Sequence, residues 1–324
     1  MRNPGFKNGF PKELERICAP IIKAPPLVSE FCGVKNVRIM DCSRTSTGTM
    51  KDYRSVEMLR HFHSSLGDGF DALLVYEITY GNSGYSMGKM AEIFNRSLGS
   101  KAEKRVHVVN LVDKKIDPAI KAKLRSVSEV VEVDLSKALD YKQRYAIAEK
   151  SKTARNLMKS HLKAYAMEPE LFSVLFSEGL YKRLVAQTIK IDADAILLPV
   201  GSGELYYNFT LYHPGHIEMN HFPHAPSPIL GITVAGNPMF SHGRIPSMAD
   251  KLVAMGTSFR RHAARVKLVE EGDVREALSM LQEAGIKAEP SAAVAFAGAK
   301  GIGRDTRLLI INTGCGLHPG FDVL

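Results

Sequence analysis

Short apolar segments alternate with longer amphipathic segments along most of this 324-residue chain. A short run of β-branched and aliphatic residues is typical of a buried strand, whereas apolar residues three or four positions apart are typical of a helix. The pattern predicts strands at 37–40, 72–79, 105–112, 127–133, 195–200, 229–235, 266–269 and 308–311. It predicts helical pieces within 141–166 and helices at 56–64, 118–125, 178–189, 273–284 and, after a turn at 80–84, up to about 94.

Strands that alternate with helices over this length predict an α/β fold with a parallel, doubly wound sheet, in which ligands bind at the carboxyl ends of the strands. The chain is long enough for two domains. One irregular stretch, 206–228, is rich in His, Pro, Asn and aromatic residues, and it predicts a long loop near the functional site.

Composition narrows the classes of function. Hydrophobic residues make up 45% of the chain and charged residues 24%, as in ordinary globular proteins. No apolar run reaches the roughly 18 residues of a membrane span, and the N-terminus has no apolar core of a secretory signal, so we expect no membrane contact and a cytoplasmic location. The net charge of +9 comes from scattered lysines and arginines, which argues against a nucleic-acid partner and agrees with a small anionic substrate.

The four cysteines show no CxxC spacing, which favours free thiols over a disulfide framework or a zinc site. His213, His216, His221 and His224 form an HxxH…HxxH series that suggests imidazole ligands. The prolines between them break any helix that would align the four rings, and no cysteine or carboxylate pair completes a ligand set. We therefore expect no metal, and a loop over the site instead.

Three glycine-rich turns each follow a predicted strand, at 81–84, 201–203 and 313–316. The second has the physics of a phosphate cradle, because glycines allow a tight turn and backbone N–H groups at the next helix start can bind an anion. An ordinary strand-to-helix turn remains the alternative. The turn lacks the GxGxxG spacing of a dinucleotide site.

Lys51 lies in the heptad Ser-Thr-Gly-Thr-Met-Lys-Asp, where a strand pattern changes to a helix pattern. A lysine amine at such a turn can form a Schiff base with a small aldehyde ligand, because its pKa falls readily on burial. The alternative is a surface lysine at a helix start, where the helix dipole disfavours a cation.

The order TGT-x-KD, GNSG, PVGSG, EPSAA and TGCG resembles the fold-type II pyridoxal-phosphate enzymes, the tryptophan synthase β-like family, and is most similar to threonine synthases. The resemblance runs from Ala24 to Gly320. It implies two domains, each a mainly parallel twisted sheet flanked by helices, with pyridoxal 5'-phosphate in the interdomain cleft. The smaller domain would be 46–160, and the larger would be 1–45 plus 161–324. It also implies a homodimer.

The resemblance assigns roles to individual residues. Lys51 would form the Schiff base and move the substrate's α-proton, Asn82 would bind the cofactor's phenolic oxygen, and Thr313 would face the pyridine nitrogen. The cofactor phosphate would be bound by Gly201, Ser202, Gly203, Glu204 and Leu205. The substrate would be bound by Thr79, Ser83, Gly84 and Ser291. Simpler roles are a turn residue for Asn82, a strand-end cap for Thr313 and the N-cap of a helix at 292–299 for Ser291.

A neutral hydroxyl at the pyridine nitrogen favours elimination and replacement over transamination. The expected reaction is therefore threonine synthase-like, from O-phosphohomoserine to threonine and phosphate. The alternatives are a serine/threonine dehydratase or another β-replacement enzyme such as a cysteine or cysteate synthase. Three departures from the family pattern leave a non-catalytic binding or regulatory protein as a further alternative, namely Cys42, Tyr53 with Arg54 one residue later, and Glu204.

Overall fold

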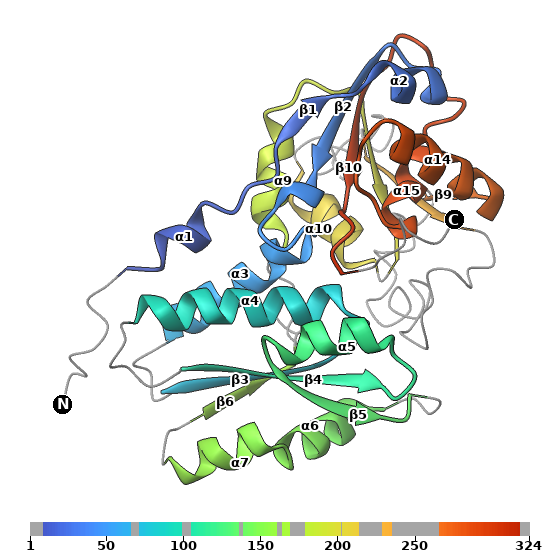
Figure 1. Cartoon of the computed structure of the whole chain (residues 1–324). Helices are drawn as coiled ribbons and strands as arrows, with labels where there is room; N and C mark the ends of the chain where they lie inside the picture. Colours follow the sequence, from blue (N-terminus) through green and yellow to red (C-terminus); the bar gives the residue numbers. More distant parts are fainter. Residues whose placement is uncertain are drawn as a thin grey trace. The chain divides into compact units, whose positions relative to one another are not determined.

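The computed structural model of the chain describes residues 9–65, 71–98, 105–135, 139–160, 164–168, 179–201, 203–213, 229–234 and 266–317. The chain divides into two compact units, drawn in Figure 1. The first unit comprises Met1–Ile17 and Lys51–Leu180, and the second comprises Cys18–Met50 and Tyr181–Leu324. Within the described ranges, no helix is both long and apolar enough to cross a membrane.

The first unit is built on a parallel sheet of strand order β5-β4-β3-β6. Its strands are β3 (Ala72–Ile78), β4 (Val106–Asp113), β5 (Glu129–Val133) and β6 (Ala164–Met167). Figure 1 shows α4 (Asn82–Ser97) and α5 (Pro118–Arg125) on one face, and α6 (Tyr141–Glu149) and α7 (Lys152–Lys159) on the other. Two further helices, α3 (Lys51–Ser65) and the short α1 (Lys12–Glu15), pack on α4. Both faces of the sheet are therefore covered, as parallel sheets require.

Local side-chain chemistry starts these helices. The Asp117 carboxylate accepts hydrogen bonds from the N–H groups of Ala119 and Ile120, and Pro118 occupies the first helical position of α5. Asp140 and Gln143 form a capping box at the start of α6.

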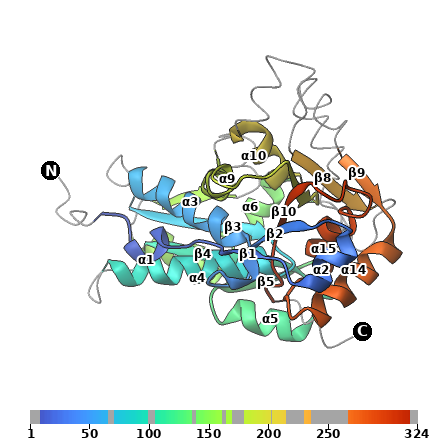
Figure 2. The same ribbon diagram turned by 90° about the horizontal axis from the view of Figure 1, so that it is seen from above.

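The second unit contains a sheet of order β1-β2-β10-β7-β8-β9, in which only the β1–β2 pair is antiparallel among the described strands. Its strands are β1 (Ile21–Lys23), β2 (Asn36–Asp41), β7 (Ala195–Pro199), β8 (Ile229–Val234), β9 (Val266–Val269) and β10 (Arg307–Asn312). In Figure 2, α9 (Lys182–Ile189) and α10 (Glu204–Tyr212) lie on one side of these strands. The opposite side carries α2 (Pro26–Cys32), α14 (Glu271–Glu283) and α15 (Pro290–Ala297).

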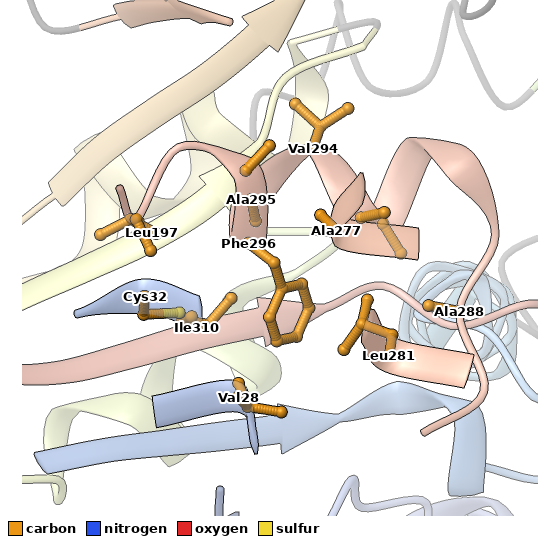
Figure 3. Packing of buried hydrophobic residues seen from close by; sticks show 14 of the residues in the cluster. Val28, Cys32, Leu197, Ala277, Leu281, Ala288, Val294, Ala295, Phe296 and Ile310 are labelled. Carbon is orange, nitrogen blue, oxygen red and sulfur yellow. The ribbon is translucent and has the colours of Figure 1, made fainter. Parts of the chain in front are cut away.

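The core of the second unit lies between the sheet and α2, α14 and α15. Figure 3 shows the Phe296 ring at its centre, close to Ile310 of β10, Leu281 of α14 and Val28 of α2. All four side chains are fully buried. Burying aliphatic and aromatic side chains of this size stabilises the fold by about 1.5–3 kcal/mol each.

The α/β fold class and all the predicted strands are confirmed. Two predictions about elements were wrong. The end of 141–166, predicted helical, forms β6, because Ala164–Met167 pairs with the exposed edge of β3. Residues 206–212, predicted to be loop, belong to α10, because burial of Tyr206 and Phe209 outweighs their weak helix propensity. The pattern also missed α1, β1 and α2.

The bounds of the two units differ from the expected 46–160 domain. The first unit begins at Lys51 and continues to Leu180, because β6 pairs with β3 beyond residue 160. It also includes Met1–Ile17, since α1 packs on α4.

Candidate active site

Lys51 is the half-buried first residue of α3, so this helix begins earlier than the predicted residue 56. The segment before it is fixed to the segment after β10. The N–H of Met50 donates to the carbonyl of Thr313 at 3.0 Å, and the carbonyl of Gly48 accepts from Cys315 and Gly316 at 3.0 Å each. The structure therefore brings together two motifs that are far apart in the sequence.

Gly314 is essential to this contact. It forms an antiparallel bridge with Thr49, and its φ of 102° lies in a region that favours glycine. A Cβ atom at this position would lie 2.1 Å from the carbonyl oxygen of Gly48 and 2.9 Å from Cα of Thr49. Only glycine permits the two backbones to approach this closely.

Two buried polar residues at the carboxyl ends of adjacent strands support the same region. Asn312 donates to the Asp41 carboxylate and to the carbonyl of Lys287, both at 2.9 Å, and its Oδ1 accepts from the N–H of Gly314 at 3.1 Å. Asp41 also pairs with Arg44 at 3.0 Å. Asp41 and Asn312 were not predicted from the sequence, although a charged residue and an amide at the ends of two apolar strands were a usable signal.

Thr313 is buried, with 4% of its surface exposed. The start of α15 lies against the same segment, since the N–H of Glu289 donates to the carbonyl of Gly314 at 3.1 Å. Ser291 donates to the Glu289 carboxylate at 2.5 Å. The N-cap of this helix is Glu289, so the prediction that Ser291 caps it was wrong.

Cys315 lies in this segment and is a free cysteine. Partial burial, followed by the negative charges of Glu289 and Asp41, raises the pKa of its thiol. The thiol therefore stays protonated, as a small packing residue, at neutral pH.

In the first unit, the predicted substrate loop connects β3 to α4. The Thr79 hydroxyl oxygen accepts hydrogen bonds from the N–H groups of Gly81 at 3.1 Å and Gly84 at 3.0 Å. Asn82 is the first residue of α4 and follows directly on Gly81. A Cβ atom at Gly84 would lie 2.3 Å from Oδ1 of Asn110, so the loop rests directly on β4.

The Ser83 side chain points to a buried ion pair. Its hydroxyl donates to the Glu77 carboxylate at 2.6 Å, and Arg54 pairs with the same carboxylate oxygen at 2.7 Å. Arg54 also donates to the Ser83 hydroxyl. Glu77 was not identified from the sequence. Arg54 was noted there only as part of a departure from the family pattern, because it lies one residue after Tyr53.

The predicted phosphate turn follows β7. Gly203, with a φ of 81°, is the N-cap residue of α10, and a Cβ atom at Gly201 would meet no atom within 4 Å. A helix N-terminus behind such an open turn is suited to an anion. Glu204 is the first helical residue and Leu205 is buried, whereas Ser202 lies outside the described residues. The negative charge of the Glu204 carboxylate opposes a bound phosphate.

Of the four histidines in the HxxH series, only His213 lies within the described ranges. Its ring stacks on that of Phe209 with centroids 6.5 Å apart, and burial lowers its pKa. The described part of the chain contains no cluster of three or more side chains that could hold a metal ion. Residues Arg260–Arg265, the other basic group noted in the sequence, lie outside the described residues.

Residues 13–314 match the family model "Pyridoxal-phosphate dependent enzyme". The chain belongs to this family. The cofactor of this protein is therefore pyridoxal 5'-phosphate, as the sequence motifs predict. No curated protein matches the chain significantly.

Solved structures share the fold of this family member. An O-ureido-L-serine synthase is similar at 15% identity and a TM-score of 0.64, over 94% of this chain and 91% of that one. Threonine deaminase isoform 2 from Solanum lycopersicum, in its processed form, is similar at 16% identity and a TM-score of 0.60, over 98% and 93%. An ACC deaminase homologue is similar at 21% identity and a TM-score of 0.61, over 94% and 92%.

The residues of this family member fit the cofactor. The open turn at Gly201 and the N-terminus of α10 suit its phosphate, and the buried Thr313 offers a neutral hydroxyl group. Lys51 is half-buried at the start of a helix, where the positive end of the dipole disfavours a charged ammonium group. A neutral amine is the form that reacts with an aldehyde.

Proposed function

We propose that this protein catalyses an elimination or replacement reaction on an amino acid, with pyridoxal 5'-phosphate held covalently by Lys51. The observation that carries the proposal is the 3.0 Å hydrogen bond from Met50 to Thr313. It fixes Met50, which precedes Lys51, against the segment that contains Thr313. The order of the five sequence motifs supports the same assignment.

Each residue has a defined task in this proposal. Lys51 binds the cofactor and moves the proton at the substrate Cα. The turn at Gly201 to Leu205 binds the phosphate, and Asn82 and Thr313 orient the ring. The loop from Thr79 to Gly84 binds the substrate carboxylate. When bound, pyridoxal phosphate supplies an electron sink for the negative charge that develops at Cα.

The nature of Thr313 favours elimination over transamination. A neutral hydroxyl group does not hold a pyridine nitrogen protonated as a carboxylate would, so less negative charge moves into the ring. Charge that stays near Cα is available to expel a leaving group from Cβ. Expulsion of a phosphate from Cγ, as in O-phosphohomoserine, also requires loss of a proton from Cβ.

We propose O-phosphohomoserine and water as the substrates and threonine and phosphate as the products, a threonine synthase-like lyase reaction. The motifs Thr47-Gly48-Thr49 and Thr313-Gly314-Cys315-Gly316 support this choice, as does the net charge of +9, which suits an anionic substrate. The alternative is serine or threonine dehydration, or another β-replacement. It is supported by the fold similarity to a threonine deaminase and an O-ureido-L-serine synthase.

The cofactor assignment is tested by colour. The purified protein should be yellow, and borohydride should bleach it and leave the cofactor mass on the peptide that contains Lys51. Lys51→Ala should be colourless, whereas the matched control Lys89→Ala, at an exposed ion pair on α4, should stay yellow. A wild-type protein that stays colourless with added cofactor would contradict the proposal.

The reaction is tested by a product screen with O-phosphohomoserine, L-serine and L-threonine. Release of phosphate with threonine supports the first choice. Release of ammonia with a 2-oxoacid supports the dehydratase alternative. Bound cofactor without any product from the three substrates would support a non-catalytic binding protein.

A further inference from the structure

A buried polar cluster lies behind the loop that we assign to the substrate carboxylate. It consists of Arg54 on α3, Glu77 near the end of β3 and Ser83 in the first turn of α4. The side chains of Arg54 and Glu77 are only 8% and 4% exposed, and their ion-pair distance is 2.7 Å. A pair buried this deeply costs several kcal/mol of desolvation per ion, which additional hydrogen bonds must offset.

The additional hydrogen bonds go to Ser83. A serine hydroxyl has one proton to donate and two lone pairs that accept. The Ser83 proton is donated to Glu77 at 2.6 Å, and Arg54 donates to the Ser83 oxygen. In this arrangement the hydroxyl has no proton left for a substrate carboxylate, so Ser83 serves the loop in a different way from the role that the family resemblance implies.

The rest of the loop is held just as firmly. The Thr79 hydroxyl oxygen accepts from the N–H groups of Gly81 and Gly84, and Gly84 lies against Asn110 with no room for a Cβ atom. Glu77 and Asn110 are direct partners in the parallel register of β3 and β4. Oδ1 of Asn110 is buried and has no hydrogen-bond partner among the described residues. Buried polar side chains of β3, β4 and α3 therefore hold the first turn of α4 in place.

We propose that Arg54 and Glu77 are positioning residues, which hold the Ser83 hydroxyl and so orient the first turn of α4 toward the substrate carboxylate. This inference rests on the proposed function, since it assumes that the loop binds an amino acid. Arg54 lies one helical turn after Lys51, so the same helix carries the cofactor lysine and the residue that orients the loop. Selectivity for a carboxylate should then depend on residues that never touch it.

The test measures the affinity of the holoenzyme for two probes, L-serine and L-serinamide, which lacks the carboxylate. The absorbance change of the bound cofactor reports each apparent Kd. Glu77→Gln and Ser83→Ala should each weaken L-serine binding about fivefold to tenfold, the value of one or two hydrogen bonds, and leave L-serinamide almost unchanged. The double variant should lose no more than either single variant, because both changes break the same contact.

Three further variants separate positioning from general loss of structure. Ser83→Thr keeps the hydroxyl and should keep the wild-type preference for L-serine. Glu77→Asp keeps the charge that Arg54 needs but withdraws the oxygen from Ser83, so it should behave as Glu77→Gln does even if the latter folds poorly. Glu92→Gln, the same chemical change at an exposed ion pair on α4, is the matched control and should have no effect.

Equal weakening of both probes by Glu77→Asp and Ser83→Ala would overturn the inference, as would additive losses in the double variant. A wild-type holoenzyme whose absorbance responds to neither probe nor to O-phosphohomoserine would contradict the proposed function, and the inference with it. If the wild type responds and the variants keep its preference for L-serine, the inference is overturned while the proposed function stands.

Discussion

The contact between Gly314 and Gly48 makes a strong prediction for the variant Gly314→Ala. The new Cβ atom would lie 2.1 Å from a backbone carbonyl oxygen, which cannot rotate away as a flexible side chain would. The segments before Lys51 and after β10 must therefore separate. Three backbone hydrogen bonds join them at 3.0 Å, those from Met50, Cys315 and Gly316.

The expected loss of stability combines two contributions. An alanine at a φ of 102° is strained by about 1–2 kcal/mol, and each lost hydrogen bond costs about 1 kcal/mol. We expect the free energy of unfolding to fall by about 4–5 kcal/mol in total. The affinity for pyridoxal phosphate should fall as well, because the segment before Lys51 loses its support.

Urea titration followed by circular dichroism measures the loss, and Gly285→Ala is the matched control. Gly285 also has a positive φ, 70°, but a Cβ atom there meets no atom within 4 Å. The control should lose only the strain of about 1–2 kcal/mol. Equal losses for the two variants would show that the close approach at Gly48 contributes nothing, and would refute the reasoning.

The other predictions concern the core, the acid range and the thiols. Phe296→Ala should lower the free energy of unfolding by about 3–5 kcal/mol in the same titration, because the ring is fully buried; a loss under about 1 kcal/mol would contradict the packing in Figure 3. Hydrogen bonds from Arg307 lower the pKa of Asp194 from 3.8 to about 2. The pair therefore stabilises the fold above the unfolded pKa and loses this effect as the pH falls toward 2, so Asp194→Asn should show a smaller loss of stability on acidification. Burial raises the pKa of Cys32 to about 12, whereas Cys18 is exposed. Iodoacetamide should label native Cys18 and spare Cys32 until urea is added, as read by mass spectrometry.

The sequence pattern predicted the fold class and most elements because burial repeats with a regular period along strands and helices. It could not predict β6, whose residues Ala164–Met167 have no strand-like composition and depend on the edge of β3. It predicted a loop where α10 forms. Burial of aromatic residues in α10 stabilises the helix by more than their weak helix propensity destabilises it.

Glycine turns at strand ends were visible in the sequence because both the turn and the close approach need glycine. The polar contacts behind them were not. Glu77 and Arg54 are 23 residues apart, and Asp41 and Asn312 are 271 residues apart. Contacts at such separations follow from strand order, which a hydrophobic pattern does not specify. The sequence therefore singled out Ser83 as a candidate substrate-binding residue, which stays a prediction, but its partners Arg54 and Glu77 could not be inferred.

The pairing of β2 with β10 has a consequence for the way the chain acquires its structure during synthesis. The register places Asn36 beside Arg307, so the second sheet cannot be completed until nearly the whole chain has left the ribosome. The strands of the first sheet, by contrast, all lie between Ala72 and Met167. We expect the first unit to fold co-translationally around residues 51–180, while β1 and β2 remain without their partner strand β10 until the end of synthesis. Lys51 begins the longer segment of the early unit, whereas Met50 belongs to the late one, so Met50 would gain its hydrogen-bond partner Thr313 only at the end.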